Sequence, residues 1–349
     1  MIMVHYPKRL SVFKIVCHRR LRAAACDVLF YEGGKRMPYT GKSGKFKNAI
    51  SEIEIGTGAK AMKLGGANVL PFYTFDGEIA NAPKVGVLVS DLGIEGEPAQ
   101  VVEYYAGCET IADMAKKAAE MPGADFIAIQ LQSADPNGND ASIESCVETV
   151  KAVSEAVDCP IVVIGCGNDD KDGQLLVAVG EVLQGKNALL MSAKEATYKT
   201  VAMSGVQAQH NKVAAESAVD INLAKQLNVL ISQLGVPTAD TVMHVGTSAA
   251  GYGYEYCAST MDRVLAAALA QGDAQLALPI VTPVCTETSG TKESMTEEAD
   301  NPVWGPRDDR AADMEIVTAA ADLASGSNAV ILKHPIAVAT IKKMIEELI

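Results

Sequence analysis

The feature that most constrains this 349-residue chain is a strict alternation of short apolar runs with helical patterns. Runs rich in Val, Ile and Leu, the composition of strands buried on both faces, occupy residues 85–90, 125–131, 160–165, 187–191, 213–216, 241–245, 278–284 and 329–332. Segments with helical spacing follow them at residues 109–120, 142–157, 172–184, 194–209, 219–234, 253–270, 310–325 and 335–348. Eight strand–helix units predict an α/β fold, and the count favours a closed eight-stranded parallel β/α (TIM) barrel over a doubly wound sheet.

A hairpin precedes the first of these strands. In ISEIEIGTGAKAMKLGGANVL (residues 50–70), Ile53 and Ile55 alternate with charged residues, GTG supplies a turn, and Met62 and Leu64 alternate on the return. We expect this hairpin to plug the N-terminal end of the barrel. The polar segment 285–309 is predicted to be a long loop, either an acidic surface excursion or a functional, mobile one.

Charge is distributed unevenly along the chain. Residues 1–47 carry 11 Lys and Arg against two acidic residues, whereas the remainder has a net charge of −22. The acidic body argues against nucleic acid as a partner. The basic head is open to several interpretations: nucleic-acid or anionic-lipid binding, a solvated tail, or a start codon placed upstream of Met37. We therefore expect a basic N-terminal extension over residues 1–45, disordered or a non-native start, and a barrel with its hairpin over residues 46–349.

Several classes of protein are excluded by missing motifs. No stretch reaches the roughly 18 consecutive apolar residues of a membrane span, so we expect no membrane association. The eight cysteines form no C-x-x-C and no cluster of four, which removes the local signature of an iron–sulfur or structural zinc site. Scattered thiols in an acidic α/β chain are typical of reduced, mostly buried cysteines in the cytoplasm. The sequence also lacks a zinc-binding histidine spacing, a nucleotide P-loop and a G-x-S-x-G nucleophile elbow.

The candidate binding residues follow the predicted strands, because ligands of a β/α barrel bind at the C-terminal ends of its strands. They are Asp135, Gly138, Cys166, Gly167, Asn168, Ser192, Ala193, Asp220, Asn222, Gly251, Tyr252 and Gly253. Each has a structural alternative. The acidic and amide residues suit turns and helix N-caps, and the glycines suit tight turns. Cys166 has no sequence neighbour that would lower its pKa, so it is not expected to be a nucleophile.

This inventory favours binding over catalysis. Amides, hydroxyls, glycines and a few carboxylates suit the holding of a large, weakly charged ligand, or the docking of a protein, better than acid–base turnover. His334 precedes a helix-starting proline and is expected to pack there. A catalytic interpretation, an aldolase-like enzyme, requires a Schiff-base lysine inside the barrel, and Lys333 is the only candidate.

An ordered set of segments resembles a known family. LGGANVLPFYTFDGEI, ADPNG, IVVIGCGNDDKD, DINLAKQLN, GYGYEY and LKHP, from about Glu54 to the C-terminus, resemble the small (delta) subunit of the corrinoid iron–sulfur protein of the acetyl-CoA decarbonylase/synthase system. The chain departs from that family pattern at Gln132–Ser133, where Asp-Gly is expected, and at His244–Val245, where Asp-Pro is expected.

The resemblance implies a non-catalytic subunit of a methyl-transferring complex. It implies a cobalt-containing corrinoid (cobamide) shared with a large subunit over the barrel mouth, with the twelve residues above as its binding residues here and no iron–sulfur cluster on this chain. The implied partners are the large subunit, in a heterodimer, methyltetrahydrofolate:corrinoid methyltransferase and acetyl-CoA synthase. The implied setting is carbon fixation by the reductive acetyl-CoA pathway in an anaerobe's cytoplasm. The alternative is a stand-alone pterin-binding, corrinoid-dependent methyltransferase.

Overall fold

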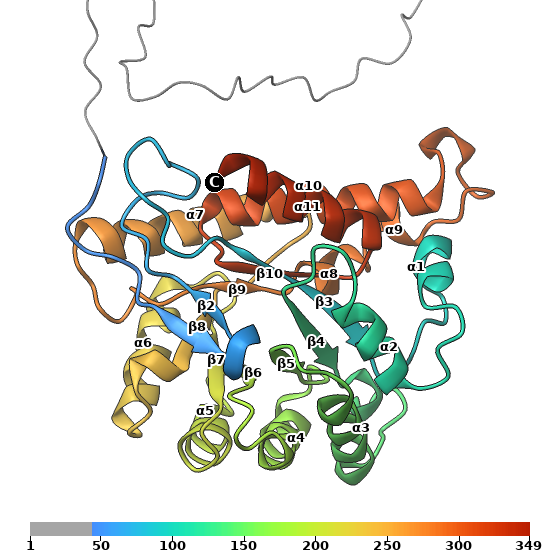
Figure 1. The fold of residues 1–349 in the computed structure, drawn as a ribbon, viewed down its shortest axis with the longest axis horizontal. Coiled ribbons are helices and arrows are strands. Elements are labelled where there is room, and N and C mark those ends of the chain that lie inside the picture. Colours follow the sequence, from blue (N-terminus) through green and yellow to red (C-terminus); the bar gives the residue numbers. More distant parts are fainter. Residues whose placement is uncertain (1–43) are drawn as a thin grey trace, which may run out of the picture. The chain divides into compact units, whose positions relative to one another are not determined.

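Eight parallel strands form the centre of the structure, a computed structural model that describes residues 44–349 (Figure 1). Hydrogen-bonded neighbours follow the order β8-β7-β6-β5-β4-β3-β10-β9, as a barrel requires. The strands are β3 Lys84–Ser90, β4 Phe126–Gln130, β5 Ile161–Ile164, β6 Leu189–Ala193, β7 Lys212–Glu216, β8 Thr241–His244, β9 Val281–Thr282 and β10 Ala329–Leu332. The predicted barrel is confirmed. The expected extension, except its last two residues, lies outside the described residues.

The barrel is nearly closed at the seam between β8 and β9. Met243 of β8 forms a parallel bridge with Ile280, and its N–H donates to the carbonyl of Pro279 at 2.8 Å. Strand β9 is shorter than the predicted run 278–284, because Pro279 and Pro283 flank it and proline has no N–H for a ladder. The seam is therefore the weakest part of the hydrogen-bonded wall.

Helices surround the barrel in the predicted alternation (Figure 1). They are α1 Ala99–Tyr104, α2 Ile111–Ala119, α3 Ile143–Ala156, α4 Asp169–Val182, α5 Tyr198–Thr200, α6 Ile221–Gln233, α7 Tyr254–Leu265, α8 Val284–Thr288, α9 Lys292–Met295, α10 Arg307–Ser325 and α11 Pro335–Leu348. The predicted helix 194–209 is α5 followed by a π-helical segment, Val201–Gln207, and α7 continues into a second one, Ala266–Ala270. The short helices α1, α8 and α9 were not predicted. The last two lie in the segment predicted to be a loop, residues 285–309.

Strand alternation divides the core into two layers. Side chains that face the barrel axis, such as Leu88 and Val162, form one buried cluster, and those that face the helices, such as Val87 and Val163, form another. The division follows from the two-residue period of a strand.

The hairpin plugs the N-terminal end of the barrel, as predicted. Strands β1 (Ile53–Ile55) and β2 (Met62–Leu64) pair in antiparallel register, and their four apolar side chains join the axial cluster. Asn187, just before β6, anchors the turn: its side-chain amide donates to the carbonyls of Glu54 at 2.9 Å and Gly56 at 3.0 Å. Its own carbonyl accepts the N–H of Gly56 at 2.8 Å.

Asn187 provides a test of this plug, because its φ of 51° lies in the left-handed region. We expect Asn187→Gly, which keeps the backbone conformation, to lose about 1–3 kcal/mol of unfolding free energy with the two amide hydrogen bonds. Asn187→Ala should lose more, because alanine tolerates positive φ poorly. Urea unfolding measures both. A glycine variant as stable as the wild type would contradict the anchoring role.

Candidate functional site

All twelve predicted site residues lie at one end of the barrel. They come from the C-terminal ends of five adjacent strands, β4 to β8, or from the loops that follow them. The residues are Asp135 and Gly138 after β4; Cys166, Gly167 and Asn168 after β5; Ser192 and Ala193 within β6; Asp220 and Asn222 after β7; and Gly251, Tyr252 and Gly253 after β8. The parallel order of these strands thus places residues more than a hundred positions apart in the sequence on one rim.

Three of the polar candidates have structural partners. The Asn168 side chain caps α4 by accepting the N–H of Lys171 at 3.1 Å. The Asp220 carboxylate caps α6, accepting the N–H of Asn222 at 2.8 Å. Asp135 accepts the N–H of Asn137 at 2.9 Å in a turn. The capping and turn alternative is therefore confirmed for these three side chains, which orient the loops of the mouth.

The loop after β5 is held by a buried carboxylate that the candidate set missed. Asp172 in α4 accepts the backbone N–H groups of Cys166 at 2.7 Å and Gly167 at 2.9 Å. Since these donors are used internally, the loop does not offer them to an anion. Burial raises the pKa of Cys166 to about 11, and nearby Asp172 adds to the effect, so Cys166 is a thiol at neutral pH. The expectation that it is not a nucleophile agrees with this environment.

Within β6, the two candidate residues have different environments. Ala193 is fully buried in the cluster between barrel and helices, so its side chain does not reach the surface of the mouth. Ser192 is half-buried, and the register of β6 against β7 shifts between Met191 and Ala193. Of this pair, only Ser192 is exposed enough to contact a ligand.

The glycine-rich loop after β8 lies on α10. Thr247 donates to the buried Asp322 carboxylate at 3.0 Å, and the N–H of Ala250 donates to Thr318 at 3.0 Å. Gly251 and Gly253 have φ of 87° and 92°, conformations that side-chain-bearing residues rarely adopt. Tyr252, at the tip, is 45% exposed and donates from its hydroxyl to Glu293 at 2.7 Å.

A charged cavity at the ends of β6 and β7 was not predicted as a unit. It has a volume of about 420 Å³ and is lined by Asp169, Lys194, Glu195, Ala196, Glu216, Ser217, Ala218 and Leu223. The ammonium of Lys194 pairs with Asp169 at 3.0 Å. Burial opposes the charged form of Lys194, but the carboxylates of Glu216 and Asp169 outweigh it and raise its pKa. The cavity therefore presents a cation between carboxylates.

His244 is the last residue of β8 and pairs in register with Glu216, which lines this cavity. Burial lowers its pKa, and Lys194 adds to that effect against the opposing carboxylate of Glu216, so its imidazole is neutral at neutral pH. Its Nδ1 is buried and has no hydrogen-bond partner. Glu216 and His244 were not among the predicted site residues. The two-residue period of β7 and β8 could have placed them, because Ala214 and Val242, two positions earlier, face the barrel axis.

Lys333 directly follows the last strand, β10, and its side-chain amine is not free. Its ammonium pairs with Glu97 at 2.6 Å, and although burial opposes the charged form, Glu97 and its other acidic neighbours raise its pKa. The buried Glu315 carboxylate accepts the N–H groups of Lys333 and His334, both at 3.0 Å. This environment stabilises a protonated lysine, whereas a Schiff-base lysine needs a lowered pKa. His334 caps α11 by accepting the N–H of Ile336 at 3.3 Å, which confirms its expected local role.

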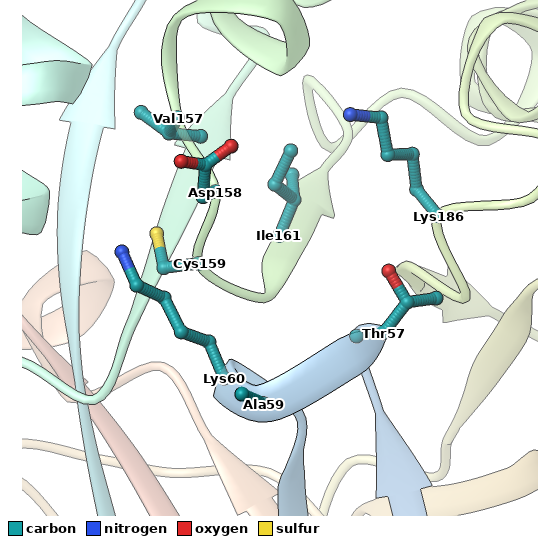
Figure 2. A pocket seen from close by; sticks show the side chains of 9 residues that line it. Thr57, Ala59, Lys60, Val157, Asp158, Cys159, Ile161 and Lys186 are labelled. Carbon is teal, nitrogen blue, oxygen red and sulfur yellow. The ribbon is translucent and has the colours of Figure 1, made fainter.

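A second cavity, of about 270 Å³, lies at the opposite end of the barrel (Figure 2). It lies between the hairpin turn and the segments that lead into β5 and β6, where Lys60, Asp158, Cys159 and Lys186 contribute side chains. The Lys186 ammonium donates to the carbonyl of Ser154 at 3.1 Å, and burial raises the pKa of the Cys159 thiol. Functional sites of such barrels lie at the other end, so we assign this cavity to the packing of the hairpin.

Two kinds of feature are absent from the part of the chain that the structure describes. Among residues 44–349, no group of three or more His, Cys, Asp or Glu side chains is arranged to hold a metal ion. In the same part of the chain, no helix has the length and apolar character needed to cross a membrane. The six cysteines in this region are free thiols, three buried and three half-buried.

The sequence matches the family described as CO dehydrogenase/acetyl-CoA synthase delta subunit over residues 52–319. It is 34% identical over 301 residues to the acetyl-CoA decarbonylase/synthase complex subunit delta 2 of Methanosarcina acetivorans, covering 84% of this chain and 67% of that protein. It is 32% identical over 308 residues to subunit delta of Methanocaldococcus jannaschii, covering 86% of this chain and 74% of that one.

Solved structures similar to this one are dihydropteroate synthases. The enzyme from Vibrio fischeri matches with a TM-score of 0.51 and 11% identity, covering 84% of this chain and 97% of that chain. A complex of the enzyme from Xanthomonas albilineans has a TM-score of 0.51 and 10% identity, covering 85% and 97%. At this identity the likeness shows the barrel fold alone.

The buried Glu315 makes stability depend on pH. Burial raises its pKa from 4.5 to about 7, outweighing the N–H groups of His334 and Lys333 that lower it. Between these values the unfolded chain loses a proton that the folded chain keeps, so this group's contribution to stability falls as pH rises and is constant above about pH 7.

We therefore expect the stability of Glu315→Gln, relative to wild type, to rise with pH between about pH 5 and 7, by on the order of 1 kcal/mol per pH unit. Urea unfolding across that range measures the difference. Glu155→Gln, at an exposed position on α3, is the matched control and should show no such trend. A pH-independent difference for Glu315→Gln would be inconsistent with a buried, titrating carboxyl.

Proposed function

The chain belongs to the CO dehydrogenase/acetyl-CoA synthase delta subunit family, and from that premise we propose that it is the small subunit of a corrinoid iron–sulfur methyl carrier. In this role it binds and covers a corrinoid shared with a large subunit. The observation that carries the proposal is the chemistry of the mouth, where caps and turns use the polar side chains and glycines leave open surface.

The mouth fits a large, flat ligand such as a corrin. A Cβ built on Gly167 or Gly251 meets no atom within 4 Å, and one on Gly138 meets nothing closer than 3.6 Å. Backbone at these points is therefore open to close approach by a ligand face. The buried imidazole of His244 is only 9% exposed, so it is not presented at the surface as a metal ligand. This suits a cobamide that takes no histidine from this chain.

The residues of this chain have binding and shielding tasks in that arrangement. When bound, the corrinoid supplies the cobalt that accepts and donates the methyl group. Tyr252, half-exposed at the loop tip, covers an edge of the mouth and excludes water. Gly251 and Gly253 flank it with positive φ, so this loop is where we expect the cover to yield when a methyl donor or acceptor docks.

The titratable groups of the mouth support a binding role. The Cys166 thiol has a pKa of about 11, and Lys333 is held protonated in its ion pair with Glu97. Neither is suited to nucleophilic attack at neutral pH. The chemistry is therefore assigned to the cofactor, and this chain contributes position and shelter.

The proposed partners follow from the same role. We place the iron–sulfur cluster and most of the corrinoid site on the large subunit. The heterodimer collects a methyl group from methyltetrahydrofolate through its methyltransferase and delivers it to acetyl-CoA synthase. This is the carbon-fixing reductive acetyl-CoA pathway of an anaerobe's cytoplasm.

Bulk introduced at the mouth tests this proposal. Gly138 has no positive φ and open space around it, so Gly138→Trp should fold while obstructing the corrin face. We expect the complex co-purified with the large subunit to lose most of its cobalt and visible corrinoid absorbance. Ala152→Trp, on the exposed surface of α3, is the matched control and should keep both. Full cobalt content in the Gly138 variant would remove the mouth from the cofactor site.

The alternative function is a pterin-binding methyltransferase that acts alone, and the charged cavity at the ends of β6 and β7 favours it. A space of about 420 Å³ is suited to a small polar ligand rather than a corrin. Its cation, Lys194, lies between Asp169 and Glu216, which offers both hydrogen-bond donors and acceptors.

The isolated chain distinguishes the two functions. We expect the purified chain, given methyltetrahydrofolate and free cobalamin, to transfer no methyl group above background, because it holds only part of the site. Visible spectra of cobalamin follow the reaction. Turnover at enzyme-like rates that disappears in Glu216→Gln would establish the stand-alone enzyme instead.

A further inference from the structure

The segment between β9 and α10, residues 283–306, forms a rigid platform beside the barrel mouth, here called the β9–α10 platform. It holds α8, α9 and the 3-10 turn Pro302–Trp304. Two arginines at the start of α10 fasten it. Arg307 donates to the carbonyls of Ser294 at 2.9 Å and Gly96 at 2.8 Å, and to the Glu297 carboxylate at 2.8 Å.

Arg310 is the second arginine that fastens the platform. Its guanidinium donates to three backbone carbonyls, those of Glu293 at 2.5 Å, Thr296 at 2.6 Å and Gly305 at 3.2 Å. The same group lies 5.7 Å from the centre of the Trp304 ring. Charge-assisted hydrogen bonds of this kind are stronger than neutral ones, so the platform has a fixed shape.

This fixed structure exposes apolar side chains. Val303 is 92% exposed, Met295 is 60% exposed and Trp304 is 43% exposed. These three side chains are here called the apolar tip. A single exposed apolar residue is ordinary on a protein surface. Here three lie within ten positions, on a segment whose backbone is held by two arginines, and tryptophan is the residue most typical of interface hot spots.

The platform is also acidic and lies next to the candidate cofactor residues. Residues 283–306 carry five acidic residues and one lysine, and Glu297, Glu298 and Asp300 are exposed beside the apolar tip. Tyr252, from the loop after β8, donates to Glu293 and accepts the N–H of Lys292 at 3.3 Å. On its other side, the Arg307 bond to Gly96 joins the platform to the loop after β3.

We propose that the β9–α10 platform is a protein-docking surface whose partner presents an apolar slot for Val303 and Trp304, bordered by Lys or Arg side chains. The inference rests on the proposed function, which supplies the occupant: the large subunit of the methyl carrier, seated next to the loop of Tyr252. Charge complementarity favours this kind of partner over anionic lipid or nucleic acid, which the acidic tip repels.

The test is calorimetric titration of the full chain with the purified large subunit. We expect Val303→Ser and Trp304→Ala each to weaken binding about tenfold or more, as hot-spot truncations do. Val303 is almost fully exposed, so its variant cannot be dismissed as misfolded. Phe75→Ala, at a 77% exposed aromatic in the loop before β3, is the matched control and should bind like wild type.

A second variant tests the charge of the partner. Glu298→Gln and Asp300→Asn together, which leave the Arg307–Glu297 ion pair in place, should slow association and flatten its dependence on salt, while leaving the dissociation rate nearly unchanged. A purely structural role for these exposed carboxylates would not alter the salt dependence.

The outcomes separate this inference from the proposed function. If wild type binds the large subunit and both tip variants bind equally well, the platform is not the docking surface, although the proposed function stands. If wild type does not bind at all, the proposed function fails and this inference fails with it. If sedimentation shows a wild-type dimer that Trp304→Ala abolishes, the occupant is a second copy and the proposal is overturned.

Discussion

The constraint on which the rest of this structure depends is the closure of a parallel sheet. Eight strands running in one direction place all their C-terminal ends on one rim, so residues from Ser90 to Lys333 become neighbours there. Closure also gives the strands an inner face, where alternate residues are buried around the barrel axis. At the seam, proline shortens β9, and a bridge between Met243 and Ile280 completes the wall.

Burial inside the rim determines the chemistry of the charged groups. His244 at the end of β8 is buried and Lys333 just after β10 is half-buried, and burial disfavours the charged form of each. Lys333 keeps its charge through Glu97, whereas His244 loses its proton. Lys333, which the sequence offers as a nucleophile, is therefore committed to an ion pair, and His244 is withdrawn from the surface. The surface that remains suits a cover for a cofactor.

The platform between β9 and α10 shows how a polar segment becomes ordered without a core of its own. Residues 285–309 have the composition of a loop, because their apolar side chains are few and dispersed. Their order comes instead from Arg307 and Arg310, which donate to carbonyls of the segment from the first turns of α10. Such bonds join residues with no periodic relation, so hydrophobic patterning does not reveal them.

The sequence by itself determined the barrel, its hairpin, the positions of its eight strands and the rim on which candidate residues gather. Those features follow from local periodicity and from the rule that parallel strands end together. Family membership was also readable there, in the ordered segments from about Glu54 onward. Only the tertiary structure decided which candidates are caps, that Asp172 binds the N–H groups of Cys166 and Gly167, and that Lys333 is paired. These depend on contacts between side chains and distant backbone, whose geometry exists only once the barrel has closed.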